Sequence, residues 1–471
     1  MNSHHTAHCL SKGREDRLGP SRVGIGGPRR SSLPELLFLL AIAAATAIPQ
    51  YGHDIAPGPP QSQPILLTNA DIHTVSGDAI LGGSLLFEDG IITRIASRIE
   101  GPENAQIIDL QGKQVYPGLI SANSTIGLVE INSVRATRDY QETGKANTNA
   151  RAATAINPDS EIIPVTRANG VLTSHVLPQP GAKLFGGTSA IVNLDGWTIE
   201  EMALEADAGV HIQWPGAPSE PGFRPHSDSP FNPVKAEERY LDRIRELETV
   251  FDDARAYMNA KEASDEPIPM DLRWEALIPV LKGQLHVYAN ANKYREIMDA
   301  IQWSKDEGVE LILIAGGDAW RAADAIKADD IAIIVNQVNS LPRRRWESYD
   351  TFFTNVLKLH QSGARFAIAF GGGGPLSSNE RNLPYEAAKA VGHGLPQEEA
   401  LKAITLYPAQ ILGVDDRIGS LEEGKHATLI ITDGNPLDIR TQILGAYIQG
   451  RKVDLSSRHT QLYEKYQKKY E

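Results

Sequence analysis

Residues 115–125 read Val-Tyr-Pro-Gly-Leu-Ile-Ser-Ala-Asn-Ser-Thr, and they are the most informative part of the chain. The run after the Pro-Gly pair indicates a short strand. Because successive side chains of a strand point to opposite faces, Asn123 and Thr125 lie on one face at the end of this strand. An amide or hydroxyl oxygen is a weak, neutral ligand for the zinc-type ions that imidazole suits.

This stretch resembles the first barrel strand of the amidohydrolase superfamily. In that family Pro-Gly-Leu-Ile is followed by Asp-x-His-x-His, whose two histidines hold a divalent metal. The resemblance places Asn123 and Thr125 at the two histidine positions. It continues through residues 186–190 and residues 394–425, and the second of these is typical of the imidazolonepropionase and prolidase-like branch.

The resemblance implies an α/β fold, in which a (β/α)8 TIM-like barrel is inserted in a small composite β-sandwich. Residues 64–116 and 414–471 contain short strand-like runs and are expected to form the sandwich, with a hairpin at Asp89-Gly90. Residues 117–413 alternate apolar strand-like runs with helical stretches, as a barrel does. The clearest barrel strands are predicted at residues 170–174, 285–289, 311–314, 331–335 and 366–370.

An insertion at about residues 213–271 does not fit a minimal barrel. It is rich in proline and then strongly polar, and it predicts a helix over residues 233–263 with one apolar stripe. Its place on a barrel loop allows two interpretations. It is either a lid or subunit contact, or a solvated decoration.

The remaining metal positions of the family are also replaced. The resemblance places Tyr288 where the fifth strand carries a histidine and Ala315 near the histidine of the sixth strand. The aspartate that follows the eighth strand falls within a glycine run, at Gly371 or Gly372. The resemblance therefore implies a degenerate site, and we expect no bound metal and no other cofactor.

Five other residues are candidates for the pocket, and each has a structural alternative. His286 is either a ligand inside the barrel or a core histidine, and His175 either faces the pocket or belongs to a loop. Asp318 is either an acid-base group or a helix N-cap. Arg381 and Asn382 either bind an anionic or amide group or hold their own loop in place.

Composition excludes some classes of protein. The 471 residues are 41% hydrophobic and 22% charged, which is typical of a globular chain with a large core. The formal net charge of -13 argues against nucleic acid and anionic membrane surfaces as partners.

The N-terminal residues predict export. Residues 36–47 form an apolar run too short for an ordinary membrane span, and Ala45-x-Ala47 offers a cleavage site. We expect residues 1–47 to be a signal peptide and residues 48–63 a linker, which places the mature protein in the periplasm. The alternative is an uncleaved membrane anchor. Cleavage removes Cys9, the only cysteine, so that the mature protein has no disulfide.

Two classes of function follow from these observations. The resemblance implies a hydrolase of non-peptide or dipeptide C-N bonds, but the replaced ligands predict that activity is lost or independent of metal. The alternative is a non-catalytic exported protein that binds a small amide or peptide-like ligand, or a subunit that supports a metal-bearing amidohydrolase. Either form can be a homo-oligomer or a hetero-oligomer with such a relative.

Overall fold

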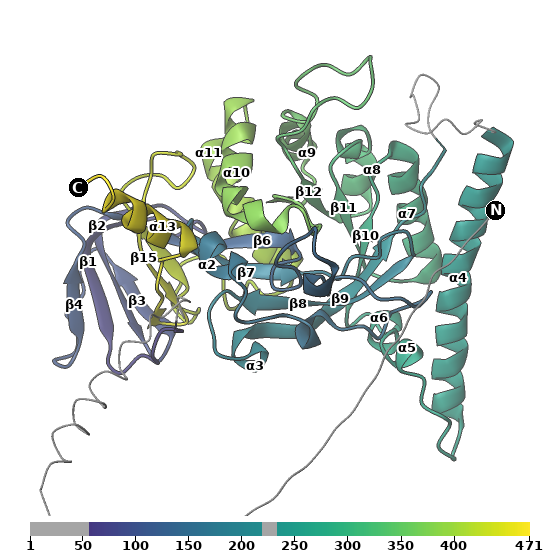
Figure 1. The fold of residues 1–471 in the computed structure, drawn as a ribbon, viewed down its shortest axis with the longest axis horizontal. Helices are drawn as coiled ribbons and strands as arrows, with labels where there is room; N and C mark the ends of the chain where they lie inside the picture. The colour runs from purple at the N-terminus through teal and green to yellow at the C-terminus, as the bar shows by residue number, and fades with distance from the viewer. Residues whose placement is uncertain (1–55, 219–232) are drawn as a thin grey trace, which may run out of the picture. The chain divides into compact units, whose positions relative to one another are not determined.

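Strands from the two ends of the described chain form one sheet, and a barrel is inserted between them (Figure 1). The computed structural model describes residues 56–218 and 233–471, and residues 54–471 form one compact unit. The sheet has the order β16-β15-β14-β5-β1-β2-β3, with β4 paired to β1. Its strands are β1 (Ile65–Ile72), β2 (Ile80–Glu88), β3 (Ile91–Ala96), β4 (Gln106–Asp109), β5 (Gln114–Pro117), β14 (Leu429–Thr432), β15 (Ile443–Ile448) and β16 (Arg451–Lys452).

The predicted hairpin is confirmed between β2 and β3, which pair antiparallel. Asp89 and Gly90 connect them with φ angles of 49° and 81°, as a tight hairpin turn requires. The eight strands are hydrogen-bonded into one sheet, not divided into two. Its β3 edge meets the segment before β14, because the backbone N–H of Ile92 donates to the carbonyl of Lys425 at 2.8 Å.

The barrel sheet has the order β13-β12-β11-β10-β9-β8-β7-β6, and β13 packs beside β6, so the barrel nearly closes. Neighbouring strands are parallel except that β8 is antiparallel to both β7 and β9. This confirms the α/β class with a barrel and a separate sheet domain. The barrel strands are β6 (Leu119–Ser124), β7 (Val171–Val176), β8 (Phe185–Asn193), β9 (Ala203–Gln213), β10 (His286–Asn290), β11 (Leu311–Ala315), β12 (Ala332–Asn336) and β13 (Phe366–Ala369).

Short helices connect the barrel strands and cover the outside of the barrel. The α-helices are α2 (Ile162–Arg167), α3 (Ile199–Met202), α4 (Pro233–Ala263), α5 (Leu272–Glu275), α6 (Ile278–Leu281), α7 (Tyr294–Glu307), α8 (Ala323–Ala328), α9 (Asn355–Ser362), α10 (Leu383–Gly392), α11 (Gln397–Lys402), α12 (Leu406–Ile411) and α13 (Arg458–Gln467). The 3-10 helices are η1 (Arg135–Thr137), η2 (Ala152–Thr154), η3 (Ala319–Arg321) and η4 (Ser377–Asn382).

Alternating side chains of β10 to β13 enter two different hydrophobic clusters. On β11, Ile312 and Ile314 join an inner cluster that also contains Tyr288 and residues of the segment 409–418. The intervening Leu313 packs into the outer cluster with the helices. Strand alternation explains this division, which fixes which residues face the barrel interior.

The insertion contributes helix α4, which packs on the outside of the barrel. Leu247 and Phe251 are buried, and the Phe251 ring meets Trp303 of α7 edge-on at 5.1 Å between ring centroids. The Tyr240 hydroxyl donates to Asp299 at 2.7 Å and accepts from the Trp214 indole at 3.2 Å. The described part of the insertion therefore packs against α7 on the outside of the barrel. It is neither a lid over the barrel mouth nor a solvated segment without packing contacts.

Strands β8 and β9 are not among the strands predicted from the sequence. The sequence of β8 begins with Phe-Gly-Gly-Thr-Ser, and β9 is rich in alanine and acidic residues, so both have low strand propensity. Pairing with buried neighbours outweighs that propensity. Within residues 56–218 and 233–471, no helix combines the length and apolar character needed to cross a membrane. The predicted signal peptide and the first half of the linker, residues 48–55, lie outside the described residues.

Candidate functional site

The carboxyl ends of β6 and β13 form the first sector of the barrel mouth, called here the β6–β13 sector and defined by Asn123, Thr125, Gly371 and Gly372. Asn123 is buried, and its side-chain amide donates to Asn336 Oδ1 at 2.9 Å. The hydroxyl of Thr125 lies 2.5 Å from that of Ser377 in η4. Both side chains thus contact neutral groups, while Asn123 Oδ1 is buried without a hydrogen-bond partner within the described residues.

The glycine run packs directly onto this pair of side chains. A Cβ atom at Gly372 would lie 2.3 Å from Asn123 Oδ1 and 2.9 Å from its Cγ. Such contacts are too short to exist, so any larger residue at 372 requires Asn123 to move. Gly371 has a φ angle of 119°, which L side chains rarely adopt. The glycines let the chain occupy the space into which the family's aspartate would project.

Glu380, which the sequence analysis did not single out, anchors this glycine-containing loop. The hydroxyls of Ser124 and Ser174 donate to its carboxylate at 2.6 and 3.0 Å. Burial raises the pKa of Glu380, while hydrogen bonds from serines that include Ser121 act in the opposite direction. The Ser121 hydroxyl itself has no hydrogen bond of normal geometry within the described residues. In the sequence, the only signal for this loop-anchoring contact is a glutamate soon after a glycine run.

His175 lies inside strand β7, fully buried, and not in a loop. Its Nδ1 lies 3.0 Å from the carbonyl oxygen of Ala122, which can only accept, so Nδ1 carries the proton. Nε2 lies 2.8 Å from the oxygen of the Ser189 hydroxyl, which also donates to the carbonyl of Gly209 at 3.1 Å, so two acceptors compete for its one proton. This contact has the geometry of a nucleophile and its base, but both side chains are fully buried. It is therefore a core polar contact, and burial lowers the pKa of His175 to about 3.

Tyr288 is a core residue and not a mouth residue, which corrects the sequence-based placement. It is the central residue of β10, fully buried in the inner cluster, and its ring lies over Gly209, where a Cβ would be 2.5 Å away. Its hydroxyl has no hydrogen-bond partner within the described residues, and burial raises its pKa. The ligand position on β10 has become part of the packed interior.

His211 also faces the interior, directly across from Tyr288 in the register of β9 and β10. Its Nδ1 donates to the carbonyl of Pro178 at 2.7 Å. Burial lowers the pKa of His211 to about 4, which keeps the ring neutral near pH 7. His211 is therefore a buried residue of β9 beside the site.

Two further predicted site residues do not reach the barrel mouth. Ala315 packs in the outer cluster between β11 and the helices, because strand alternation turns it away from the interior that Ile314 faces. His286 lies at the opposite end of β10, partly exposed, with Nε2 at 3.1 Å from Glu310. Neither can supply a ligand at the carboxyl ends of the strands.

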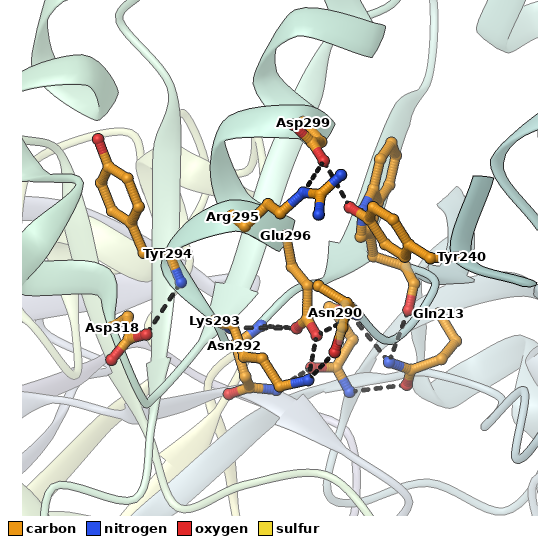
Figure 2. A network of polar contacts seen from close by, with 12 residues as sticks. Gln213, Tyr240, Asn290, Asn292, Lys293, Tyr294, Arg295, Glu296, Asp299 and Asp318 are labelled. Atoms are coloured by element: carbon orange, nitrogen blue, oxygen red, sulfur yellow. Dashed lines mark hydrogen bonds and ion pairs between the residues drawn. The ribbon is translucent and has the colours of Figure 1, made fainter. Parts of the chain in front are cut away.

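The carboxyl ends of β10, β11 and β12 form the second sector, called here the β10–β12 sector and defined by Asn290, Asn292, Glu296, Asp318 and Arg344. Figure 2 shows the first four of these residues. Asn290 donates to Gln213 Oε1 at 3.1 Å and accepts from Asn292 at 2.9 Å. The Glu296 carboxylate accepts from the backbone N–H groups of Asn292 and Lys293, both at 3.1 Å. These bonds fix the loop between β10 and α7.

Asp318 is the ionic centre of the β10–β12 sector. Its carboxylate accepts from Arg344 at 2.6 and 2.7 Å, and from the backbone N–H of Tyr294 at 3.0 Å. Burial alone raises the pKa of Asp318, but the hydrogen bonds from Arg344 and Tyr294 outweigh it and leave the pKa below its ordinary value. Asp318 stands at the N-cap position of η3 without a side-chain capping bond, although the Arg321 guanidinium of η3 donates to its carboxylate at 3.2 Å. Asp318 therefore links the segments that contain Tyr294, Arg321 and Arg344, and it does not cap η3.

Arg381 and Asn382 hold their own loop in place. The guanidinium of Arg381 lies 2.7 Å from Nδ1 of His459 in α13, and its backbone carbonyl accepts from Asn169 at 2.6 Å. Asn382 occupies the N-cap position of α10 without a side-chain capping bond. Neither residue joins the contacts of the β6–β13 sector.

The residues present do not fit a divalent metal. The four positions of the β6–β13 sector supply an amide, a hydroxyl and no side chain at the two glycines, whereas zinc-type sites use imidazole, thiolate or carboxylate. Among residues 56–218 and 233–471, no three histidine, cysteine, aspartate or glutamate side chains converge as metal ligands. What the arrangement can do is hold its loops together, through neutral hydrogen bonds at Asn123 and Thr125 and through the carboxylates of Glu380 and Asp318.

Comparisons with known proteins agree on the family. A model of the amidohydrolase family matches residues 286–460. The chain is 26% identical over 403 residues to Amidohydrolase tasK of Hapsidospora irregularis. This match covers 78% of the chain and 39% of the relative, so the chain spans about two fifths of that protein's length.

Solved structures extend the likeness to nearly the whole described chain. An amidohydrolase from Thermotoga maritima MSB8 has a TM-score of 0.71 and 25% sequence identity, covering 83% of this chain and 99% of that one. A prolidase solved with N-methylphosphonate-L-proline has a TM-score of 0.50 and 16% sequence identity, and the match again covers 83% of this chain and 99% of that one. The similarity to the prolidase shows a shared fold.

Proposed function

Because the chain belongs to the amidohydrolase superfamily, we propose that it is a member in which metal-activated hydrolysis has been lost and the barrel has a non-catalytic role. The observation that carries this proposal is the contact of Gly372 with Asn123. Where relatives of the family place histidines and an aspartate around a metal, this chain packs a glycine against an amide. The same donor set leads us to propose that no cofactor is bound.

A hydrolase assay tests this proposal. The full chain should show no turnover of N-acyl amino acids, dipeptides or cyclic amides, with or without added zinc or manganese. Asn123→Ala serves as the matched variant, since a metal-dependent site at the β6–β13 sector would lose activity with it. Metal-dependent turnover that disappears in Asn123→Ala would overturn the proposal.

Metal-independent hydrolysis has one geometric candidate, the contact of His175 with Ser189. Its two side chains are fully buried within β7 and β8, so substrate cannot approach the hydroxyl without opening the barrel. We therefore expect Ser189→Ala to leave any weak background hydrolysis unchanged. A clear loss of a reproducible activity in this variant would assign catalysis to the pair.

Binding of a small ligand is a second candidate role, favoured by a cavity beside the mouth. This cavity of about 210 Å³ lies among loops that follow β6 and β7, and its lining includes Asp139, Glu142, Arg151 and Pro178. The Arg151 guanidinium is paired with Asp207 at 2.6 Å, which leaves the lining acidic. Its volume is below the usual range of about 300 to 1,000 Å³ for small-molecule sites, so only a small amide or amine fits.

A thermal-shift screen with small amides and amines tests this second role. We expect a stabilising compound to lose its effect in Asp139→Asn, whereas Asp416→Asn, which changes an exposed carboxylate elsewhere, should retain it. An equal effect in both variants would place the compound outside this cavity.

We also propose that the protein is exported through the apolar run at residues 36–47. The support is the sequence of that run and the Ala45-x-Ala47 site after it. N-terminal sequencing of protein from the cell envelope should give a mature chain that begins near Ile48. An intact Met1 in the membrane fraction would instead indicate an anchor.

A further inference from the structure

Arg343 carries a guanidinium at the barrel mouth that has no ion-pair partner in the described part of the chain. The residue lies on the loop between β12 and α9, which begins at the carboxyl end of β12. It is exposed, and within residues 56–218 and 233–471 its side chain forms no hydrogen bond or ion pair. Barrel proteins place their sites at this end of the strands. The Arg343 guanidinium is therefore a candidate for ligand recognition.

Packing holds the Arg343 side chain in place. Its guanidinium lies over the buried ring of Phe352, with 5.2 Å between the guanidinium carbon and the ring centroid. Its Nη1 approaches the buried Gly317 that follows β11, where an added Cβ atom would lie 3.3 Å from it. Arginine stacks on aromatic faces in this way. A side chain that is already ordered loses less conformational entropy when a ligand binds.

The backbone around Arg343 is fixed as well. The Glu347 carboxylate accepts from the backbone N–H groups of Arg343 and Arg344 at 2.6 and 2.9 Å. The guanidinium of Arg344 then ties the loop to Asp318 at 2.6 and 2.7 Å. The loop therefore presents the Arg343 guanidinium in a defined position.

The neighbouring ion pairs do not balance the charge of Arg343. The carboxylates of Asp318 and Glu347 both accept from Arg344, and Asp318 also accepts from Arg321 at 3.2 Å. These two carboxylates thus meet two other guanidinium groups, and the positive charge of Arg343 is added to a balanced cluster. Local positive charge at the mouth of a chain with a formal net charge of -13 attracts anions to this point.

An exposed aromatic ring lies beside the same ion pairs. The Trp346 ring is 5.4 Å from the guanidinium of Arg344 and 5.8 Å from that of Arg321, and Trp346 is 57% exposed. Both guanidinium groups contact Asp318, the residue after Gly317, so the ring and Arg343 lie in the same part of the mouth. An aromatic surface near a guanidinium suits an anion with an apolar body.

We propose that Arg343 and Trp346 form a binding site for a small organic carboxylate with an apolar body. The planar guanidinium of Arg343 matches a carboxylate in bidentate geometry, and the Trp346 ring packs against the apolar body. This site is separate from the cavity lined by Asp139 and Glu142. The inference goes beyond the proposed loss of hydrolysis and does not depend on it, because binding is measured without turnover.

Calorimetric titration with two matched probes tests the proposal. N-acetyl-L-phenylalanine and N-acetyl-L-phenylalaninamide share the apolar body, and only the first carries a carboxylate. Wild type should bind the acid at least about tenfold more tightly than the amide, because the amide cannot form the charge-assisted hydrogen bonds to arginine. Equal affinity for the two probes, or no binding of the acid, would overturn the proposal.

Variants of the two residues locate the site. Arg343→Met should weaken binding of the acid at least about tenfold, leave binding of the amide unchanged and unfold at the wild-type temperature. Arg343→Lys keeps the charge without the planar fork, so its affinity for the acid should fall between those of wild type and Arg343→Met. Trp346→Ala should weaken binding of both probes, because it removes the surface for their shared ring.

The matched control is Arg94→Met, which removes an exposed arginine from β3 in the other sheet. It lowers the net charge of the chain as much as Arg343→Met does, and it should bind the acid like wild type. Unchanged affinity for the acid in Arg343→Met, or an equal loss in Arg94→Met, would overturn the proposal.

Discussion

The two sectors of the barrel mouth are built in opposite ways. The β10–β12 sector is charged, with Asp318 held by Arg344 and by the backbone of Tyr294. The β6–β13 sector is neutral, with Asn123 and Thr125 bonded to an amide and a hydroxyl and overlain by glycine. The ion pair of Asp318 with Arg344 therefore holds loops together at the mouth, whereas the four residues that define the β6–β13 sector carry no charge.

The largest effect is expected in the β10–β12 sector, from Asp318→Ala. The Asp318 side chain is 2% exposed and that of Arg344 is 12% exposed, so the variant takes a buried carboxylate from a largely covered guanidinium. Breaking a buried ion pair on one side costs up to about 3 to 5 kcal/mol of unfolding free energy, and the remaining contact of Arg344 with Glu347 at 2.7 Å places the loss toward the lower end. Urea denaturation measures this loss. Asp416→Ala, at an exposed pair, should change stability by less than about 0.5 kcal/mol.

A smaller effect is expected in the β6–β13 sector, from Gly372→Ala. The added Cβ meets Asn123, and overpacking of this kind costs about 1 to 3 kcal/mol. Asn123→Ala should relieve the clash, so the double variant should lose less unfolding free energy than the sum of the losses in the two single variants. Gly392→Ala, where a Cβ meets nothing within 4 Å, is the control. Additive losses would mean that the glycine run does not pack on Asn123 in solution.

The interior between the sectors predicts an acid-dependent loss of stability. The folded-state pKa values of His175 and His211 are lowered to about 3 and about 4 from an ordinary value near 6.5. Their stabilising contribution is therefore complete above pH 6.5 and is lost as pH falls toward 4. Each histidine adds up to about 1.4 kcal/mol per pH unit to the slope in this window.

Denaturation at several pH values tests this account of the interior. We expect the unfolding free energy of His211→Gln to fall less steeply than that of wild type between pH 6.5 and 4, because the variant lacks one buried imidazole. Taking the difference between the two proteins removes the contribution of Glu380, whose raised pKa favours the folded state at lower pH. If the unfolding free energies of both proteins fell with the same slope, His211 would not be a buried neutral residue in the folded state.

The smallest effect is expected from Tyr288→Phe. The Tyr288 hydroxyl is buried without a hydrogen-bond partner within the described residues, so its removal should raise stability by up to about 1 kcal/mol. Thermal unfolding measures the change. A loss of more than about 1 kcal/mol would mean that the hydroxyl bonds to a group in the interior and that this position retains a binding role.

The fold could be predicted because its signals are local and repeated. The Asp89-Gly90 hairpin, the helix over residues 233–263 and the apolar runs of β10 to β13 all match the structure. The strands β8 and β9 could not be predicted, because their residues favour other structures and form strands only by pairing with their neighbours.

The site was less predictable because the position of a residue along a predicted strand does not fix how deep its side chain lies in the barrel. Tyr288 was expected at the mouth, yet it lies one layer below Asn290, and Ala315 faces outward by alternation. Glu380 and Arg344 act through contacts between segments distant in sequence, which no local pattern records. Only the replacement of family residues by Asn123 and Thr125 was visible in the sequence itself.

The metal content of the purified full chain tests the central claim most directly. After dialysis, elemental analysis should find zinc, nickel, manganese and iron each well below one equivalent, because the side chains of the β6–β13 sector offer only a neutral amide and a neutral hydroxyl. Calorimetry with zinc should likewise show no stoichiometric site. Stoichiometric metal that is lost in Asn123→Ala or Thr125→Ala would contradict the account, since the sector would then hold a metal after all.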